Sequence, residues 1–168
     1  SSSAHLILVP LVGDWPDQGP MIDIAVHLGT LGAVMVYFRQ DVATMFLGVL
    51  ALLRGRFTSG ARLFVLICLG TVPALVVGYI LASQGYMEQL RSPLLIAWMT
   101  VLFGLLLWAV DNICLRVNRM EQLNYTAILL IGLAQCLALI PGTSRSGITI
   151  TAARALGYER SDAARISL

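Results

Sequence analysis

The chain has 168 residues, of which 58% are apolar and 12% are charged, and its mean hydropathy is +0.82. So few charged side chains cannot cover the surface of a soluble domain, and the high hydrophobicity excludes a disordered chain. The composition therefore predicts an integral membrane protein.

The charged residues and the cysteines exclude several functions. All 11 positive residues are arginines, so the chain can form neither a lysine Schiff base nor a P-loop of the form GxxxxGK[ST]. The net charge is only +2 and the arginines are scattered, which argues against a nucleic-acid partner. The three cysteines lie singly in apolar runs, so neither a disulfide framework nor a zinc site is expected, and no metal ligand is predicted within the chain.

Apolar stretches predict three transmembrane helices, at residues 22–38, 63–82 and 94–110. The stretch 42–53 is too short to cross and is interpreted as an interfacial or half-inserted helix. Residues 126–140 would reach only about 22 Å as a helix, short of a hydrocarbon core about 30 Å thick. Because Pro141 and Gly142 follow directly, we expect residues 126–157 to form a re-entrant segment that returns to its side of entry.

The arginines predict the orientation of these spans. The successive connections hold 0, 4, 1 and 2 arginines, which the positive-inside rule interprets as out, in, out, in. This topology places Pro141 to Gly147 deep in the membrane and favours a site that opens to the periplasm. Arg145 is the only charge between Glu121 and Arg154, and an arginine at that depth costs at least about 2.5–3.5 kcal/mol.

The segment around Arg145 has the composition of an anion site. A forked guanidinium, several hydroxyls, glycines that admit close approach and the start of a helix together favour binding of an oxyanion or phosphate. The alternative is a structural role in which Arg145 only pins two helices together. The candidate binding residues are Gly142, Thr143, Ser144, Arg145, Ser146 and Thr149.

A second hydroxyl-rich segment, Ser1 to His5, also precedes an apolar run. The imidazole of His5 can act as nucleophile or general acid/base, although N-terminal serines are also common in tags and linkers. Ser2 can be set against Ser144, each at the head of an apolar stretch. Residues 1–9 are therefore expected to end a first re-entrant segment, related to the second by an inverted repeat. Asp23 and His27 share a helical face, either lining a cavity or forming a structural hydrogen-bond pair.

The motifs together resemble one family. Leu137 to Thr149 is similar to the PGxSRSxxT signature of the undecaprenyl-diphosphate phosphatases, the bacitracin-resistance family, and Ser1 to Leu6 resembles that family's SS[TS][GA]H segment. Residues 23–34 and 158–168 resemble further stretches of the family. The resemblance implies an all-α, polytopic integral membrane protein with re-entrant segments in an inverted repeat. Residues 1–168 would form a single domain and a fragment, lacking an N-terminal glutamate motif and C-terminal spans.

The resemblance also implies an activity. The expected reaction converts undecaprenyl diphosphate to undecaprenyl phosphate and inorganic phosphate in the bacterial inner membrane. It recycles the lipid carrier for peptidoglycan synthesis, and so supports cell-wall biogenesis, cell shape and bacitracin resistance. Arg145 would clamp the diphosphate with help from Gly142, Ser144, Ser146 and Thr149. Ser2 and His5 would be the nucleophile and its acid/base partner, and which of them attacks phosphorus is left open.

The remaining expectations concern the cofactor and partners. The family resemblance implies a divalent cation, Mg²⁺ or Ca²⁺, held by two glutamates upstream of Ser1, so that the fragment alone would be inactive. The expected partners are the polyprenyl diphosphate substrate, membrane lipids and, as one option for the oligomeric state, a second copy in a homodimer. The alternative function is a transporter or lipid-carrier flippase with an anion site between broken helices, which would release no inorganic phosphate.

Overall fold

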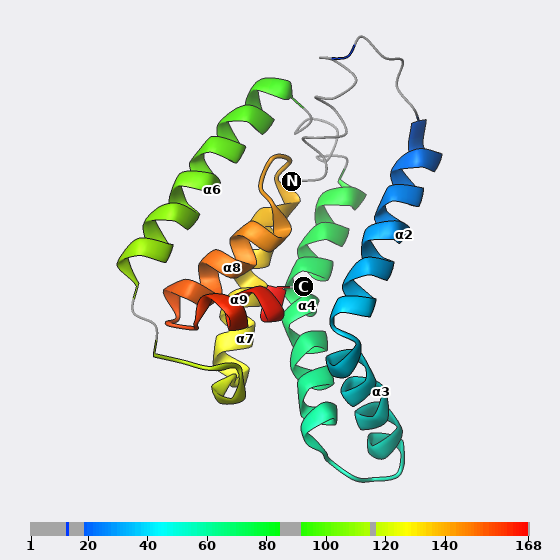
Figure 1. Cartoon of the computed structure of the whole chain (residues 1–168). Helices are drawn as coiled ribbons and strands as arrows, with labels where there is room; N and C mark the ends of the chain where they lie inside the picture. The colour runs from blue at the N-terminus through cyan, green and yellow to red at the C-terminus, as the bar shows by residue number, and fades with distance from the viewer. Residues whose placement is uncertain (1–12, 14–18, 85–91, 115–116, 168) are drawn as a thin grey trace. The chain divides into compact units, whose positions relative to one another are not determined.

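The computed structural model describes residues 13, 19–84, 92–114 and 117–167. Within these ranges the regular elements are all α-helices or 3-10 turns, so the prediction of an all-α protein is confirmed. The elements, labelled in Figure 1, are α2 (Gly19–Tyr37), α3 (Arg39–Leu53), α4 (Ser59–Ser83), α6 (Pro93–Ile113), η1 (Met120–Gln122), α7 (Tyr125–Gln135), η2 (Cys136–Leu139), α8 (Arg145–Ala155) and α9 (Arg160–Ser167).

Two of these helices are long and apolar enough to cross a membrane. They are α4, with a mean hydropathy of 2.4, and α6, with 2.1 over Leu94–Ile113. The helices α2 and α3 pass the same test only as a pair, and they meet at an angle of 85°. Helices long and apolar enough to cross at these positions support the prediction of a membrane protein, because a helix satisfies its own backbone groups in lipid. The division into spans at 22–38, 63–82 and 94–110, with a re-entrant segment at 126–157, remains a prediction.

The described residues divide into two compact units, with the boundary inside α4 between Leu66 and Ile67. In the first unit α3 lies directly against the start of α4. A Cβ added to Gly48 would lie 2.8 Å from the Cα of Gly60, and one added to Gly60 would meet the backbone of Thr44. Glycines are therefore required here, because only they let two helix backbones come this close.

The second unit holds the rest of α4 and the helices α6 to α9. The backbones of α4 and α7 touch, since a Cβ on Gly132 would lie 3.1 Å from the Cα of Gly70. Beside this contact, α7 buries Ala127, Ile128 and Ile131. The short helix α8 then packs against α6, α7 and α9 (Figure 1). Packing on three neighbours makes α8 the central element of this unit.

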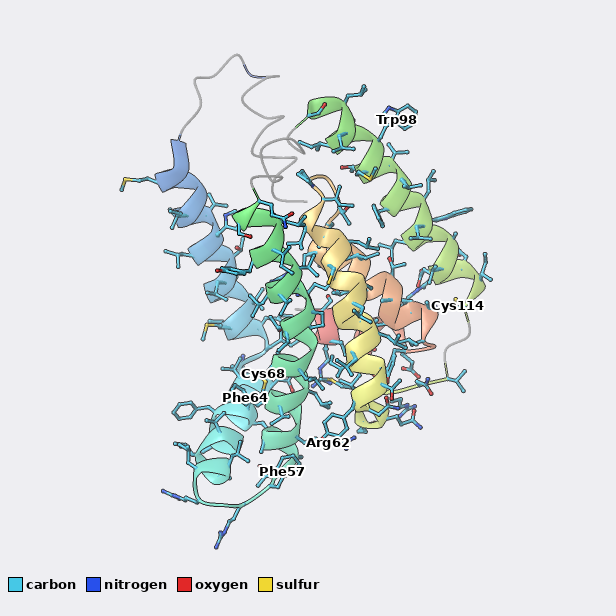
Figure 2. The ribbon with its side chains drawn as sticks, turned by 180° about the vertical axis from the view of Figure 1, so that it is seen from behind. Phe57, Arg62, Phe64, Cys68, Trp98 and Cys114 are labelled. Atoms are coloured by element: carbon cyan, nitrogen blue, oxygen red, sulfur yellow. The ribbon has the colours of Figure 1, made fainter. Side chains whose placement is uncertain are left out.

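Helix α6 carries large apolar side chains that are exposed in the described part of its unit. Trp98 near one end of the helix and Trp108 near the other are 65% and 68% exposed, and Figure 2 shows Trp98 projecting from the ribbon. Large apolar side chains exposed along a helix of this length are typical of a surface in contact with lipid.

Gly132→Ala is expected to destabilise the second unit by about 1–3 kcal/mol, because the added methyl group forces α4 and α7 apart. The measurement is the unfolding free energy of the detergent-solubilised protein. Gly104→Ala is the matched control, since no atom lies within 4 Å of its added Cβ. A Gly132→Ala protein as stable as Gly104→Ala would contradict the close contact between the two helices.

Candidate functional site

A tight turn connects η2 to α8 and places the predicted signature residues at a helix start. The N–H of Thr143 donates to the carbonyl of Ile140 at 3.1 Å, closing a four-residue turn with Pro141 and Gly142 at its centre. Gly142 has φ +94°, a left-handed conformation that is strained for any residue with a side chain. Proline followed by glycine with positive φ is the pattern of a type II turn. Residues 140–144 are called the 140–144 loop below.

The 140–144 loop lies directly on α6. A Cβ on Gly142 would lie 2.8 Å from the Cα of Ile96 and would also meet the Ile96 carbonyl oxygen. The Gly142 carbonyl in turn accepts a hydrogen bond from the hydroxyl of Thr100 at 3.1 Å. Glycine at position 142 is thus required both by its conformation and by the space available.

Ser144 caps the N-terminus of α8. Its Oγ accepts from the N–H of Gly147 at 3.2 Å and lies 3.2 Å from the Oγ of Ser146. The cap explains why the helix begins at Arg145, since a serine hydroxyl is among the best partners for a free N–H in the first turn. It also brings two hydroxyls together at the helix start.

The first turn of α8 presents donors without acceptors. Within the part of the chain that the structure describes, the backbone N–H groups of Ser144, Arg145 and Ser146 donate to no acceptor. Arg145 is exposed and makes no ion pair in that part of the chain. A cation at the positive end of a helix is unfavourable unless an anion lies between them. Donors of this kind beside a guanidinium are the composition expected of an anion site, and the binding of an anion here stays a prediction.

The side chain of Thr143 is a separate observation that favours an anion site. Thr143 is only 5% exposed, and its Oγ1 is buried without a hydrogen-bond partner among the described residues. A buried hydroxyl left unpaired costs about 1–3 kcal/mol, so a ligand oxygen that pairs with it would recover that free energy. Thr143 directly precedes Ser144, the residue that caps α8.

Thr149 has a different environment from the other predicted binding residues. It is 2% exposed, and its hydroxyl donates to the carbonyls of Arg145 and Ser146 at 2.9 and 3.1 Å. Its proton is therefore committed to the first turn of α8. The structure thus brings Gly142, Thr143, Ser144, Arg145 and Ser146 to one helix start, with Thr149 supporting that turn from inside. Their roles toward a ligand remain predictions.

The remaining predicted residues are not brought into this site. Ser2 and His5 lie outside the described residues, and with them the proposed first re-entrant segment at 1–9 and its inverted-repeat relation to α7 and α8. Asp23 falls within α2, and His27 is exposed on the same helix. Whether this pair lines a cavity or is structural stays open. Among the described residues, no group of three or more His, Cys, Asp or Glu could hold a metal ion.

Sequence reasoning missed the most buried charge in the described structure. Arg154, at the end of α8, is 0% exposed and donates through Nε to Asp111 Oδ1 at 2.8 Å. Its other nitrogens donate to the carbonyls of Tyr158, Asp111 and Cys114 at 2.6, 3.1 and 3.3 Å. A buried arginine is tolerated only when it is paired and hydrogen-bonded in this way. The signal available was Asp111, the only acid at the end of the third apolar stretch.

Asp111 joins three helices through two arginines. Arg160 of α9 donates to its Oδ1 at 2.9 Å and lies 2.6 Å from its Oδ2. The pKa of the Arg160 guanidinium is raised mainly by its hydrogen bonding to Asp111 and, to a smaller extent, by the attraction of the carboxylate charge. The connection before α7 is tied to the same end, because the Met120 N–H donates to Asp162 and the Asn118 side chain donates to Leu156. The far end of α8 is therefore attached to α6, and the neighbouring α9 is attached to α6 and to the connection before α7.

Asp111→Ala is expected to lower the unfolding free energy by about 3 kcal/mol, because it leaves the Arg154 charge buried without its carboxylate. The value is at the low end for breaking a buried pair, since the Asp111 side chain is 25% exposed. Denaturant unfolding in detergent measures it.

Glu159→Ala is the matched control at the same end of the unit. It removes an exposed pair in which Arg119 Nε lies 3.7 Å from Glu159 Oε1, and we expect a change below about 0.5 kcal/mol. Equal losses in the two variants would refute a special role for the buried pair.

Comparisons with known proteins give the context of this site. The family described as "Bacitracin resistance protein BacA" matches residues 1–168. The chain is 51% identical to "Undecaprenyl-diphosphatase 1" of Rhodospirillum rubrum, covering 100% of this chain and 62% of the relative. It is 53% identical to "Undecaprenyl-diphosphatase" of Alcanivorax borkumensis and 50% identical to that of Ruegeria pomeroyi, covering 99% and 100% of this chain and 63% of each relative. The chain thus spans about three-fifths of the length of these curated relatives, and it belongs to the BacA family of bacitracin resistance proteins.

Proposed function

We propose that the protein is an undecaprenyl-diphosphate phosphatase, which cleaves the lipid diphosphate to undecaprenyl phosphate and inorganic phosphate. The observation that carries the proposal is the start of α8, which combines Arg145 with three N–H groups that have no acceptor among the described residues, directly after the buried Thr143. The names of the relatives, each an undecaprenyl-diphosphatase, supply the substrate. The product is the carrier reused in peptidoglycan synthesis, which links the reaction to cell-wall biogenesis, cell shape and bacitracin resistance.

In this proposal the described residues bind and neutralise the diphosphate. The N–H groups of Ser144, Arg145 and Ser146 donate to the non-bridging oxygens of one phosphate, and the Arg145 guanidinium clamps them from the side. Because the three N–H groups are held by the turn and the Ser144 cap, they need no rearrangement when charge builds up during the reaction. Such preorganised donors are the main source of catalysis in phosphoryl transfer.

The nucleophile is proposed from the family resemblance. Ser2 or His5 attacks the terminal phosphorus, the bond to the bridging oxygen breaks, and undecaprenyl phosphate leaves. Water then releases the phosphoryl group from the protein as inorganic phosphate. Both residues lie outside the described part of the chain, so the assignment rests on the SS[TS][GA]H likeness alone.

A divalent cation is proposed as cofactor on the same basis. When bound, Mg²⁺ or Ca²⁺ would offset the negative charge of the diphosphate. The described residues do not form its site, because they contain no group of three or more candidate ligands and Asp111 is committed to Arg154 and Arg160. The family resemblance implies that the ligands are a glutamate pair upstream of Ser1.

The proposed setting is the bacterial inner membrane, crossed several times, with the site open to the periplasm. The exposed apolar faces of α4 and α6 support a surface in contact with lipid, where the polyprenyl tail would lie. A homodimer is an option that the proposal does not require.

The test uses a chimera in which these 168 residues replace the matching segment of the Rhodospirillum rubrum relative. Reconstituted in vesicles with undecaprenyl diphosphate, it is expected to release inorganic phosphate. Arg145→Ala should lower kcat/KM about 100- to 1,000-fold, since it removes charge stabilisation in the transition state.

Arg119→Ala is the control, because that side chain is 70% exposed and outside the site, and its rate should match the unaltered chimera. Equal rates in the two variants would overturn the role of Arg145. Movement of the lipid across the bilayer without phosphate release would overturn the phosphatase and favour the transporter alternative.

A further inference from the structure

Thr100 is a hydroxyl residue within the apolar helix α6, and its single O–H is shared between two carbonyl acceptors in a three-centre hydrogen bond. Its Oγ1 lies 2.8 Å from the carbonyl oxygen of Ile96, the usual bond of a threonine to its own helix, and 3.1 Å from that of Gly142. Among the described residues, the second is the only hydrogen bond that joins the 140–144 loop to a helix other than its neighbours η2 and α8. The Thr100 hydroxyl therefore links α6 to the 140–144 loop as well as bonding within its own helix.

The bond holds one particular peptide group. The peptide between Gly142 and Thr143 has its N–H on the Ile140 carbonyl and its C=O on the Thr100 hydroxyl. Without Thr100, only one side of this peptide would be held, in a turn whose glycine gives the backbone unusual freedom. A carbonyl oxygen is the negative end of the peptide dipole. If it turned toward the free N–H groups and Arg145, it would repel an anion there.

We propose that Thr100 is a positioning residue of the anion site. Its hydroxyl keeps the Gly142 carbonyl against α6, so that only donors face the bound phosphate groups. The choice of a diphosphate as the ligand rests on the proposed function. The effect of Thr100 on anion binding can be measured without catalysis.

The far end of α8 maintains the alignment on which Thr100 depends. Thr100 and Asp111 lie on the same helix, 11 residues and about 16 Å apart along its axis. Asp111 holds Arg154 at the end of α8, while Thr100 holds Gly142 just before its start. With both ends attached to α6, α8 cannot slide along it, and the Thr100 hydroxyl stays opposite the Gly142 carbonyl.

The test compares Thr100→Val, Thr100→Ser and Thr71→Val in the chimera described above. Valine removes the hydroxyl and keeps the branched shape, whereas serine keeps the hydroxyl. Thr71 is the matched control in α4, because within the described residues its Oγ1 bonds to the Ile67 carbonyl of its own helix alone, at 2.8 Å. Isothermal titration with inorganic pyrophosphate measures anion binding, and phosphate release from undecaprenyl diphosphate measures kcat and KM.

We expect Thr100→Val to weaken pyrophosphate binding and to lower kcat/KM, each about tenfold, the effect of one hydrogen bond. Thr100→Ser should stay within about twofold of the unaltered protein, as should Thr71→Val. Pyrophosphate binding unchanged in Thr100→Val would overturn the proposal. Equal weakening by serine and valine would also overturn it, because the methyl group would then matter and not the hydroxyl.

The two proposals fail in different ways. If the unaltered chimera binds pyrophosphate but releases no phosphate from the lipid, the proposed phosphatase is wrong. The dependence of pyrophosphate binding on the Thr100 hydroxyl still decides the role of Thr100 in that case.

Discussion

The ion pair between Arg154 and Asp111 is the contact on which the second unit depends. Arg154 has no exposed surface, and its guanidinium is satisfied only because Asp111 and three backbone carbonyls surround it. Since an unpaired charge at this place would be too costly to bury, the end of α8 has one position relative to α6. That attachment and the turn before α8 together determine where the helix starts. In this position Gly142 lies on the backbone of Ile96.

The two arginines of α8 therefore have opposite roles. Residue composition alone directs attention to Arg145, the one charge in a long apolar segment. The structure leaves Arg145 exposed at a helix start whose N–H groups have no acceptor among the described residues, and it buries Arg154 nine residues later. An arginine whose three nitrogens are all hydrogen-bonded stabilises the fold, whereas one placed beside the positive end of a helix needs an anion. This contrast is what makes the first residue a candidate for chemistry and the second a structural one.

Several features of the site were accessible without the structure, because they are local. The apolar runs at 63–82 and 94–110 lie within α4 and α6, although each helix extends into polar flanking residues that apolar patterning does not mark. The break at Pro141 and Gly142, the cap at Ser144 and the helix that follows are likewise determined by residues within one turn of each other. Such short-range preferences act whatever the rest of the chain does.

The amino-acid sequence by itself determined the membrane class, the helical elements and the motif that resembles the bacitracin-resistance family. Only the tertiary structure decided which residues support that motif. Thr100 and Gly142 are 42 residues apart, and Asp111 and Arg154 are 43 apart. No periodicity or spacing links such partners, because they meet only after α6 and α8 pack together. The partners of Thr100 and Asp111 are therefore known only from the packing of α8 on α6.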